Sequence, residues 1–576
     1  MNEVIDMLYN EVDDNMIKYT ADFETTTNEF DCRVWAWGLC EIGNFDNFKY
    51  GNSINGFIRF LESNAPLSLY FHNLKFDGEF IIDYLFRNNF NHVEDRKELK
   101  SNTFTTLISD MGLFYSIEIC FYKKGKYKKC VKIYDSLKII PFSVDVVAKS
   151  FNLPISKLEI DYKQNRKVGH LLTTEEINYL RNDVEIMARA LNVLFNENLT
   201  KMTTGANALS NYKEIISEDR FNKLFPIPDY DSDIRQAYKG GFTYLNKKYK
   251  DKIVGEGIVL DVNSLYPSVM YFESLPYDEG VFFEGEYKED KIYNLYIQCL
   301  TCSFKLKKDH VPSIQIKHNL MFCETEYLES SENPDGDLVT LCLTNVDLKL
   351  MFEQYDVSDI TYHCGWKFKS AKNLFKDYID KWIKVKIEST INGNKGMRTL
   401  AKLMLNSLYG KFALSPKVRS KIPYFDKEKD MVMYKFGEEE EREPIYLPIG
   451  IFITSYARYK TISSAQTVYD RFIYADTDSL HLEGLDIPKN LEISDTDLGA
   501  WKIENRFTRA KFIRQKSYIE EIDGNLNITC AGMPKGCYPY VTFDNFKIGA
   551  TYNGKLQHHR VKGGVVLKEI DFSIKK

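Results

Sequence analysis

The chain has 576 residues, a hydrophobic fraction of 44% and a formal net charge of -6. This length predicts about three to four globular folding units rather than one core. No run approaches the ~20 apolar residues that a membrane span needs, and the acidic N-terminus differs from a secretory signal, so we expect a cytosolic protein. The charge gives no general attraction to nucleic acid, although basic clusters interleaved with aromatic residues occur.

The eleven cysteines are an odd number scattered over a long chain, which predicts reduced thiols rather than a disulfide framework. Cys299 and Cys302 form a CxxC pair within a strand-like alternating run, where positions three apart point to opposite faces. No second pair follows at zinc-finger spacing. We therefore interpret these two residues as packing cysteines.

Residues 1–200 mix strand-like runs with helical segments and predict one α/β domain. A strong helix begins at about Thr173, where Thr173 and Glu176 form a capping box. A proline-containing stretch near 222–233 then predicts a linker before a larger α+β unit, whose helices dominate around 372–412 and 449–469. The acidic run 437–443 predicts a loop tip.

The N-terminal unit contains several spaced carboxylates. Asp22 and Glu24 lie two apart in a strand and share one face, while Tyr179 and Asp183 lie four apart on one helix face. Asp77 lies between these segments. Each segment alone favours a solvated strand edge or a surface helix, but together they predict a site for two metal ions that hydrolyses a phosphodiester.

A second carboxylate set lies in the C-terminal unit. Asp476 and Asp478 stand at the tip of an apolar hairpin, and such close like charges indicate a cation between them. Asp261 ends an apolar strand, where an isolated Asp is more often a cap. The three acids together favour two-metal phosphoryl transfer.

The segment 397–412 predicts a helix that Gly410 terminates. Its polar arc is typical either of a solvated basic face or of a site that grips a triphosphate. The arc contains Arg398, Lys402, Asn406 and Tyr409. Farther on, alternation predicts that Arg514, Lys516 and Tyr518 share a strand face, which either contacts a primer backbone or faces solvent.

These segments resemble the motifs of the family B DNA polymerases, in particular the protein-primed branch of the bacteriophage phi29 type. The exonuclease motifs are matched by DFETTT (22–27), HNLKFDG (72–78) and YLRND (179–183). The polymerase motifs are matched by DVNSLYPS (261–268), KLMLNSLYG (402–410) and YADTDS (474–479). The branch is indicated by YKGG (238–241) and KSY (516–518).

The resemblance implies a ribonuclease H-like α/β exonuclease domain at 1–200. It further implies an α+β right-hand polymerase domain at 201–576, with two terminal-protein-region insertions. The expected parts are palm at about 201–317 and 446–510, insertion one at 318–373, fingers at 374–412, insertion two at 415–445 and thumb at 511–576. Insertion one would engage a terminal protein, and insertion two would close around duplex DNA. The acidic run 437–443 is unusual for a DNA-facing loop.

For the exonuclease, the resemblance implies metal ligands, assisting residues and contacts to a single strand. The ligands would be Asp22, Glu24, Asp77 and Asp183, assisted catalytically by Tyr179 and Lys157. The frayed strand would be bound by Thr25, Asn73, Phe76, Ser136, Leu137 and Tyr162.

For the polymerase, it implies metal ligands, nucleotide contacts and primer contacts. Asp261 and Asp478 would bind metal, with catalytic Asp476 close by. The dNTP would be bound by Tyr266, as the gate against a ribose, and by Arg398, Lys402, Asn406 and Tyr409. Arg398 stands where a lysine is usual. DNA would be held by Tyr238, Gly240, Gly241, Thr454, Arg458, Lys516 and Tyr518, of which the YKGG element would govern traffic between the two sites.

The implied function is a DNA-directed DNA polymerase with a proofreading 3′ to 5′ exonuclease, which replicates a linear viral genome by protein priming and strand displacement. Its cofactor would be Mg²⁺, two ions per active site, with Mn²⁺ as a substitute. Its partners would be template and primer DNA, dNTPs and a terminal protein, with the chain a monomer or a heterodimer with that protein in a bacterial cytoplasm. Two alternatives remain: a nuclease with a nucleic-acid-binding C-terminal module, and a DNA-primed repair polymerase.

Overall fold

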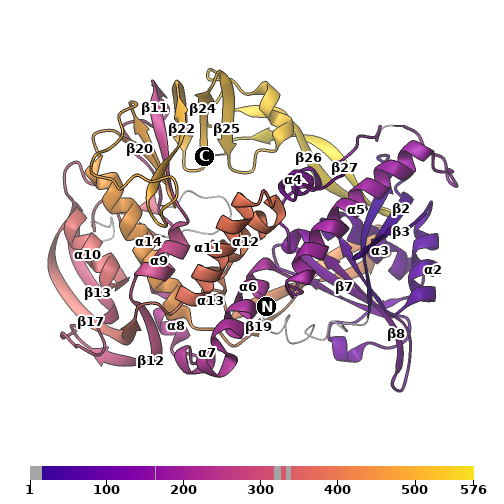
Figure 1. Cartoon of the computed structure of the whole chain (residues 1–576), viewed down its shortest axis with the longest axis horizontal. Coiled ribbons are helices and arrows are strands. Elements are labelled where there is room, and N and C mark those ends of the chain that lie inside the picture. Colours follow the sequence, from indigo (N-terminus) through magenta and orange to yellow (C-terminus); the bar gives the residue numbers. More distant parts are fainter. Residues whose placement is uncertain (1–15, 163, 317–325, 332–338, 576) are drawn as a thin grey trace.

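The computed structural model describes residues 16–162, 164–316, 326–331 and 339–575. Its N-terminal unit is an eight-stranded sheet in the order β3-β2-β1-β4-β8-β7-β6-β5, in which β4 runs parallel to both β1 and β8 (Figure 1). The strands are β1 (Ile17–Thr25), β2 (Val34–Glu41), β3 (Asn44–Gly51), β4 (Leu67–Phe71), β5 (Asn91–His92), β6 (Thr103–Ile108), β7 (Phe114–Lys124) and β8 (Tyr127–Asp135). The helices are α2 (Ile54–Asn64), α3 (Leu74–Arg87), α4 (Val144–Ser150) and α5 (Thr174–Asn196), with 3-10 turns η1 (Arg96–Glu98) and η2 (Ser136–Lys138).

Helices cover both faces of this sheet. Strand β4 is buried at every position, as expected for a central strand with parallel neighbours. Alternate β4 residues belong to different clusters: Tyr70 packs with α5, whereas Leu69 and Phe71 pack with α2 and α3. The capping box of Thr173 and Glu176 is present at the start of α5, as predicted. The carboxyl ends of β4 and β8 therefore lie side by side between two helical layers.

The centre of the C-terminal unit is an antiparallel sheet in the order β22-β11-β21-β20-β9, against which the buried helix α14 packs. Strands of this sheet are β9 (Thr243–Leu245), β11 (Gly257–Val262), β20 (Phe472–Asp476), β21 (Ser479–Glu483) and β22 (Trp501–Phe507). Nearby helices are α6 (Thr204–Ile216), α7 (Glu218–Leu224), α8 (Asp231–Ile234), η3 (Arg235–Ala237), α9 (Leu265–Phe272), α11 (Lys376–Ile391), α12 (Lys395–Ser407), α13 (Tyr409–Phe412) and α14 (Leu447–Thr467). A second antiparallel sheet, β10-β23-β24-β25, adjoins it, built from β10 (Ile253–Val254), β23 (Arg509–Arg514), β24 (Ser517–Ile522) and β25 (Asn525–Cys530), with η4 (Lys535–Tyr540) following.

A separate sheet in the order β12-β17-β13-β16 is built from strands within residues 275–371. Its first and last residues, Leu275 and Ala371, are direct cross-strand partners. The predicted insertion 318–373 covers only part of this sheet, and residues 318–325 and 332–338 of the prediction lie outside the described residues. The elements are β12 (Leu275–Glu284), β13 (Leu295–Leu306), β14 (Gln315–Ile316), β15 (Glu326–Tyr327), β16 (Thr340–Thr344), α10 (Asn345–Gln354) and β17 (Tyr355–Ala371).

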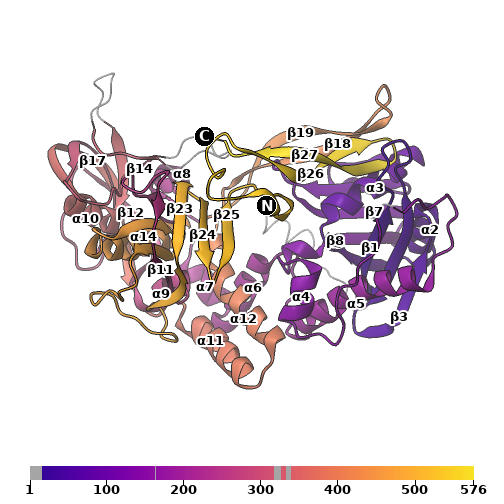
Figure 2. The same ribbon diagram turned by 90° about the horizontal axis from the view of Figure 1, so that it is seen from above.

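Two hairpins cross from the C-terminal unit to the N-terminal unit and lie near α3 (Figure 2). They are β18–β19 (Lys417–Asp426 and Met431–Glu441) and β26–β27 (Thr551–Val561 and Gly564–Ser573). Buried Glu79 of α3 accepts hydrogen bonds from Tyr434 of the first hairpin at 3.0 Å and from Arg560 of the second at 2.9 Å. Asp430 pairs with Arg87 of α3 and with Lys562, each at 2.7 Å.

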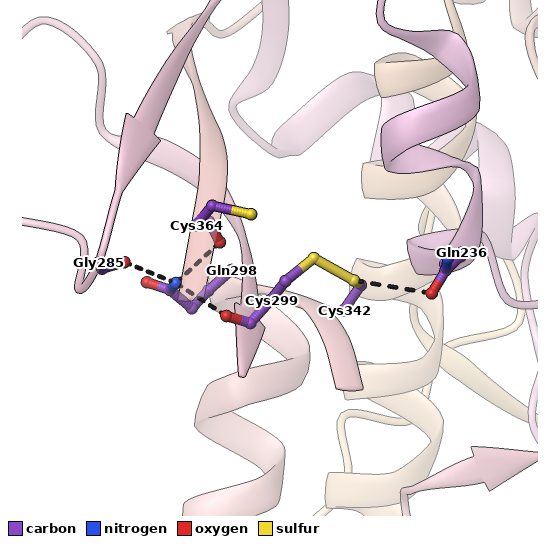
Figure 3. The surroundings of a disulfide bond; sticks show 6 residues. All are labelled: Gln236, Gly285, Gln298, Cys299, Cys342 and Cys364. Carbon is purple, nitrogen blue, oxygen red and sulfur yellow. Dashed lines mark hydrogen bonds between the residues drawn. A yellow bond between two sulfur atoms is a disulfide. The ribbon is translucent and has the colours of Figure 1, made fainter. Parts of the chain in front are cut away.

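The prediction that all cysteines are reduced is wrong, because Cys299 forms a disulfide with Cys342 (Figure 3). These residues are direct partners on β13 and β16, with Cα atoms 4.1 Å apart. Cys364 of β17 faces Cys299 from the opposite strand and remains a free thiol. The pairing depends on strand register across 43 residues, which cysteine counting does not report. Cys302 is a buried free cysteine, as predicted.

Three local predictions are also wrong. The acidic run 437–443 is no loop tip, since residues up to Glu441 form the exposed end of β19. Helix α12 ends at Ser407, and Gly410 lies inside the following turn α13. Arg514 and Tyr518 do not share one strand, because a tight turn with Lys516 at φ +54° separates β23 from β24.

Within the part of the chain that the structure describes, every helix is too short or too polar to cross a bilayer.

Candidate functional site

The predicted carboxylates of the N-terminal unit converge from three elements. Asp22 and Glu24 are on β1, Asp77 is in the first turn of α3, and Asp183 is on α5. Burial and then the charge of Asp183 raise the pKa of Asp22 to about 7. Burial, followed by the neighbouring carboxylates, also raises the pKa of Glu24 and Asp77 well above the ordinary range. This buried negative cluster requires cationic compensation.

Part of that compensation comes from Lys157, whose Nζ donates to Asp183 and, at 3.4 Å, to the hydroxyl of Tyr179. Burial opposes the charge on Lys157, but Asp183 and Asp22 outweigh burial and raise its pKa. Tyr162 and Tyr179 join their hydroxyls at 2.6 Å on the same side. The structure therefore brings all six predicted catalytic residues of this unit together.

The donor set fits hard divalent cations, which prefer carboxylate oxygens. Among the described residues, Asp77 Oδ1 and Asp183 Oδ1 are buried without a hydrogen-bond partner, as oxygens available to an ion would be. Across the same described ranges, no group of three or more Asp, Glu, His or Cys side chains is arranged to hold a metal ion as it stands. In the structure, Asp183 instead accepts a hydrogen bond from Lys157.

The residues predicted to bind single-stranded DNA lie around this carboxylate cluster, and their side chains differ in exposure to solvent. Asn73 precedes α3 in the left-handed region, with φ 77°, and its side chain is exposed. Phe76 packs edge-to-face with His558 of β26 at 5.6 Å, and Tyr162 is half exposed. Ser136 is completely buried and donates to Phe71, so its side chain is structural here. Thr25, at the end of β1, and Leu137 are partly exposed.

The predicted carboxylates of the C-terminal unit meet at the end of its central sheet. Asp261 pairs with Ser479, directly beside the turn that carries Asp478, and Val262 donates to the carbonyl of Asp478 at 2.8 Å. Burial and the charge of Asp478 raise the pKa of Asp261 to about 6. Burial also raises the pKa of Asp478. This pair therefore matches the chemistry of a site for divalent cations.

Asp476 is held differently from its neighbour Asp478. Its carboxylate accepts two hydrogen bonds from Lys516, both at 2.8 Å, and one from Thr243 at 3.0 Å. The Tyr474 hydroxyl, at 3.3 Å, donates to the same group and accepts the backbone N–H of Lys516. Protein donors thus surround Asp476, which suits a positioning role better than that of a direct metal ligand.

The helix α12 presents Arg398, Lys402 and Asn406 as exposed residues, as its periodicity predicts. Burial and then Arg398 and Lys502 lower the pKa of Lys402, while Asp261 acts in the opposite direction. Lys386 of α11 belongs to the same cationic group, since the charges of Lys402 and Arg398 lower its pKa in addition to burial. Such a group of mutually repelling cations is suited to a polyphosphate anion.

Two further residues of this group were missed from the sequence. Lys502 is the cross-strand partner of Asp261 on β22, and only the pairing register reveals it. Lys386 lies on α11, one helix before the predicted basic arc. The basic residues around 367–386 were a sequence signal for Lys386, whereas no nearby residue connects Lys502 with Asp261.

Three tyrosines lie near each other in the C-terminal unit, close to its carboxylates and its cationic group. Tyr266 of α9 and Tyr409 of α13 stack with ring centroids 3.9 Å apart and planes inclined by 23°. Burial, and then the neighbouring Tyr409, raises the pKa of Tyr266, and Tyr238 adds to this effect. The predicted nucleotide-contacting tyrosines are therefore neighbours, and Tyr238 of the YKGG segment adjoins them.

The YKGG segment contacts the turn between Asp476 and Asp478 through Gly241. A Cβ on Gly241 would lie 2.6 Å from Thr477 Oγ1, whereas a Cβ on Gly240 would meet open space. Thr477 itself has φ 59° and donates its N–H to Phe242. The segment therefore packs directly beneath the turn of Asp476 and Asp478.

Thr454 and Arg458, which are predicted to hold primer DNA, are both buried in α14, and their contact with DNA stays a prediction. Arg458 forms a bidentate pair with Asp347 and donates to the carbonyls of Lys239 and Gly240 at 2.8 and 3.1 Å. Its role is to hold the YKGG segment. Tyr518 is also largely packed, against Tyr474, His481 and Phe512.

The family model for DNA polymerase type B, organellar and viral, matches residues 63–496 of the chain. The DNA polymerase of Bacillus phage M2 is 47% identical over 97% of this chain and 99% of the relative. The chain belongs to the type B DNA polymerases. The polymerase is likewise 46% identical to the DNA polymerase of Bacillus phage phi29 and 34% identical to that of Streptococcus phage Cp-1, over 97% of the chain in each case.

Solved structures agree with this assignment. The orthorhombic crystal form of phi29 DNA polymerase superimposes with a TM-score of 0.92 and 44% identity over 97% of this chain and all of that chain. Phi29 DNA polymerase in complex with primer-template DNA gives a TM-score of 0.91 at 45% identity, over 97% of this chain and all of that chain. The expected fold class, an exonuclease domain followed by a right-hand polymerase domain, is confirmed. The family implies divalent metal cofactors, which the two carboxylate groups fit.

Proposed function

We propose that this polymerase extends a primer at the site of Asp261 and Asp478, and edits it at the site of Asp22, Glu24, Asp77 and Asp183. The observation that carries the proposal is the presence of two separate carboxylate groups, one buried in the N-terminal unit and one partly buried in the C-terminal unit, with raised pKa values. Phi29 DNA polymerase has been solved with primer-template DNA and incoming nucleotides and with single-stranded DNA. Template, primer and dNTPs are the proposed substrates.

In the synthetic site, Lys402, Arg398 and Lys386 would bind the triphosphate, and Tyr409 would pack on its base or sugar. The ring of Tyr266, stacked on Tyr409, would block a ribose 2′ hydroxyl. Asp261 and Asp478 would hold two Mg²⁺ ions, replaceable by Mn²⁺, and such ions would supply activation of the attacking hydroxyl and charge neutralisation at the leaving oxygen. Lys516 would keep Asp476 oriented beside them.

In the editing site, Phe76 and Tyr162 would receive the unstacked bases of a frayed 3′ end. Tyr179 and Lys157 would orient the attacking water, since both adjoin Asp183. The carboxylates would bind the same class of cations as those of the synthetic site.

Two variants test this division. Asp478→Ala should stop extension of a primed template with Mg²⁺ and dNTPs while leaving degradation of a single-stranded 3′ end. Asp77→Ala should do the reverse. Loss of both activities in both variants would contradict the assignment of two sites.

We further propose that the sheet of residues 275–371 engages a terminal protein, whose hydroxyl serves as the first primer in the cytoplasm of a bacterial host. Asp356 and Asp359 lie at exposed positions of β17, so Asp356→Lys combined with Asp359→Lys reverses the charge of this surface and keeps the buried residues that join the sheet to α14. Extension of a DNA primer should survive, whereas nucleotidylation of the cognate terminal protein should disappear. Retained nucleotidylation would refute this role for the sheet.

A further inference from the structure

Asp135 lies where the two strand-binding loops of the editing site begin. It is the last residue of β8 and the direct parallel partner of Phe71, the last residue of β4. The loop after β4 carries Asn73, and the turn η2 after β8 carries Leu137. Asp135 is only 2% exposed, so it is not a surface contact for DNA.

A single oxygen of Asp135 joins the two loops. Oδ1 accepts the backbone N–H of Asn73 at 3.0 Å and that of Leu137, also at 3.0 Å. The other oxygen, Oδ2, lies 3.5 Å from the Nζ of Lys138. Because one oxygen accepts both amides, it fixes the position of Asn73 relative to Leu137.

The bond to Asn73 matters because that residue has an unfavourable backbone. Asn73 has φ 77° and ψ 53°, and its side chain makes no cap to the helix α3 that follows. Asparagine enters this left-handed region more readily than most residues other than glycine, but the conformation is still strained. The hydrogen bond from the Asn73 backbone N–H to Asp135 stabilises this conformation. The exposed side chain of Asn73 is thereby left available to a ligand.

We infer that Asp135 is a positioning residue that fixes Asn73 and Leu137 in the geometry needed to hold a single-stranded 3′ end. The inference rests on the proposed editing function. Asp135 acts through the acceptor position of Oδ1, because both loops depend on that atom. Its negative charge is dispensable for this role.

A competing account assigns the charge itself to the reaction, since Asp135 is near enough to Asp77 to contribute to the raised pKa of that carboxyl. Two conservative variants separate the accounts. Asp135→Asn keeps an oxygen at the same reach and removes the charge. Asp135→Glu keeps the charge and moves the carboxylate one methylene farther from both amides.

The measurement is the concentration dependence of single-stranded oligonucleotide degradation, with primer extension by the same samples as the test of folding. We expect Asp135→Asn to stay within about threefold of the unmodified protein. Asp135→Ala and Asp135→Glu should raise the half-saturating concentration about 10- to 30-fold with a smaller change in the maximal rate, as lost hydrogen bonds predict. Primer extension should not change.

The matched control is Asp95→Ala. Asp95 caps the turn η1 by accepting the N–H of Lys97 at 2.8 Å, the same local contact at a place away from the carboxylate cluster. It should leave degradation unaltered. If Asp135→Asn loses maximal rate while Asp135→Glu keeps it, or if all Asp135 variants match the unmodified protein, the inference is overturned. Failure of the proposed function is distinct: it would appear as no degradation by the unmodified protein, or as degradation that survives Asp77→Ala.

Discussion

Lys516 donates to both carboxylate oxygens of Asp476 at 2.8 Å and thereby links the turn between β23 and β24 to the hairpin of β20 and β21. The same turn donates its backbone N–H to Tyr474, which in turn contacts Asp476. Asp476 and Lys516 thus behave as one unit, while Asp478 is left to face Asp261.

This relationship predicts non-additive effects of substitution. Asp476→Asn and Lys516→Met should each slow nucleotide incorporation about 10- to 100-fold, and the double variant should be no slower than the worse single one, because both remove the same interaction. The double-mutant cycle is measured as single-turnover incorporation rates of the unmodified protein, the two single variants and the double variant. A loss of rate in the double variant equal to the product of the two single losses would contradict a shared role.

Asp478→Asn provides the comparison for that cycle. It should lower incorporation more than 1,000-fold, since it removes charge from the site for the divalent cations. Equal losses for Asp476→Asn and Asp478→Asn would show that Asp476 is itself a direct ligand.

Protonation of the carboxylate groups predicts how metal and pH affect stability. The folded pKa of Asp22, about 7, and of Asp261, about 6, exceed the value of about 4 in an unfolded chain. The metal-free folded state therefore binds more protons than the unfolded state between pH 4 and 7, and it loses stability as pH rises through that window. Thermal unfolding in EDTA should show this loss.

Added Mg²⁺ should consequently raise the midpoint of unfolding more at pH 8 than at pH 5.5, because ions and protons compete for the same oxygens. The variant Asp22→Asn combined with Asp261→Asn is the control, and it should lose most of this difference. An equal Mg²⁺ effect at both pH values would argue against metal binding at these groups.

Gly241 is predicted to be intolerant of a side chain. A Cβ there would lie 2.6 Å from Oγ1 and 2.9 Å from Cγ2 of Thr477, a short branched residue with little freedom to move. Gly241→Ala should therefore shift the turn of Asp478 and reduce primer extension about tenfold or more. Gly255→Ala, whose Cβ would meet open space, is the control and should be neutral. Full activity of Gly241→Ala would refute the proposed contact.

The buried pair of Asp347 and Arg458 predicts a large stability effect. Arg458 has 3% side-chain exposure, and removal of one partner from a buried ion pair costs about 3 to 5 kcal/mol. Asp347→Ala should lower the free energy of unfolding by about that amount, measured by denaturant titration. Asp356→Ala, at an exposed position of β17, should change it by less than about 0.5 kcal/mol. Equal effects of the two variants would contradict the pairing.

Local patterns predicted much of both sites. The alternation of Asp22 and Glu24, the capping box at Thr173 and the hairpin of Asp476 and Asp478 depend on residues close in sequence, and all occur in the structure. The arc of Arg398 and Lys402 likewise follows from helix geometry alone.

Features that depend on pairing between distant segments were not predictable in this way. Lys502 meets Asp261, and Cys299 meets Cys342, only because of strand register. The turn at Lys516 contains no glycine, asparagine or aspartate, the usual signals of a tight hairpin, so alternation was extended across it wrongly. The burial of Arg458 could not be predicted either, because its partner Asp347 is on another helix.

The two hairpins that pack on α3 connect a C-terminal segment of the chain to the helix that carries Asp77. Glu79, gripped by Arg560 and Tyr434, lies two residues after Asp77 in the same helix. Strands β26 and β27 therefore hold α3 in place. This helix carries Asp77, which belongs to the carboxylate group formed by the first 200 residues. Truncation of the chain at its C-terminus should therefore impair editing first, although the editing site lies in the N-terminal unit.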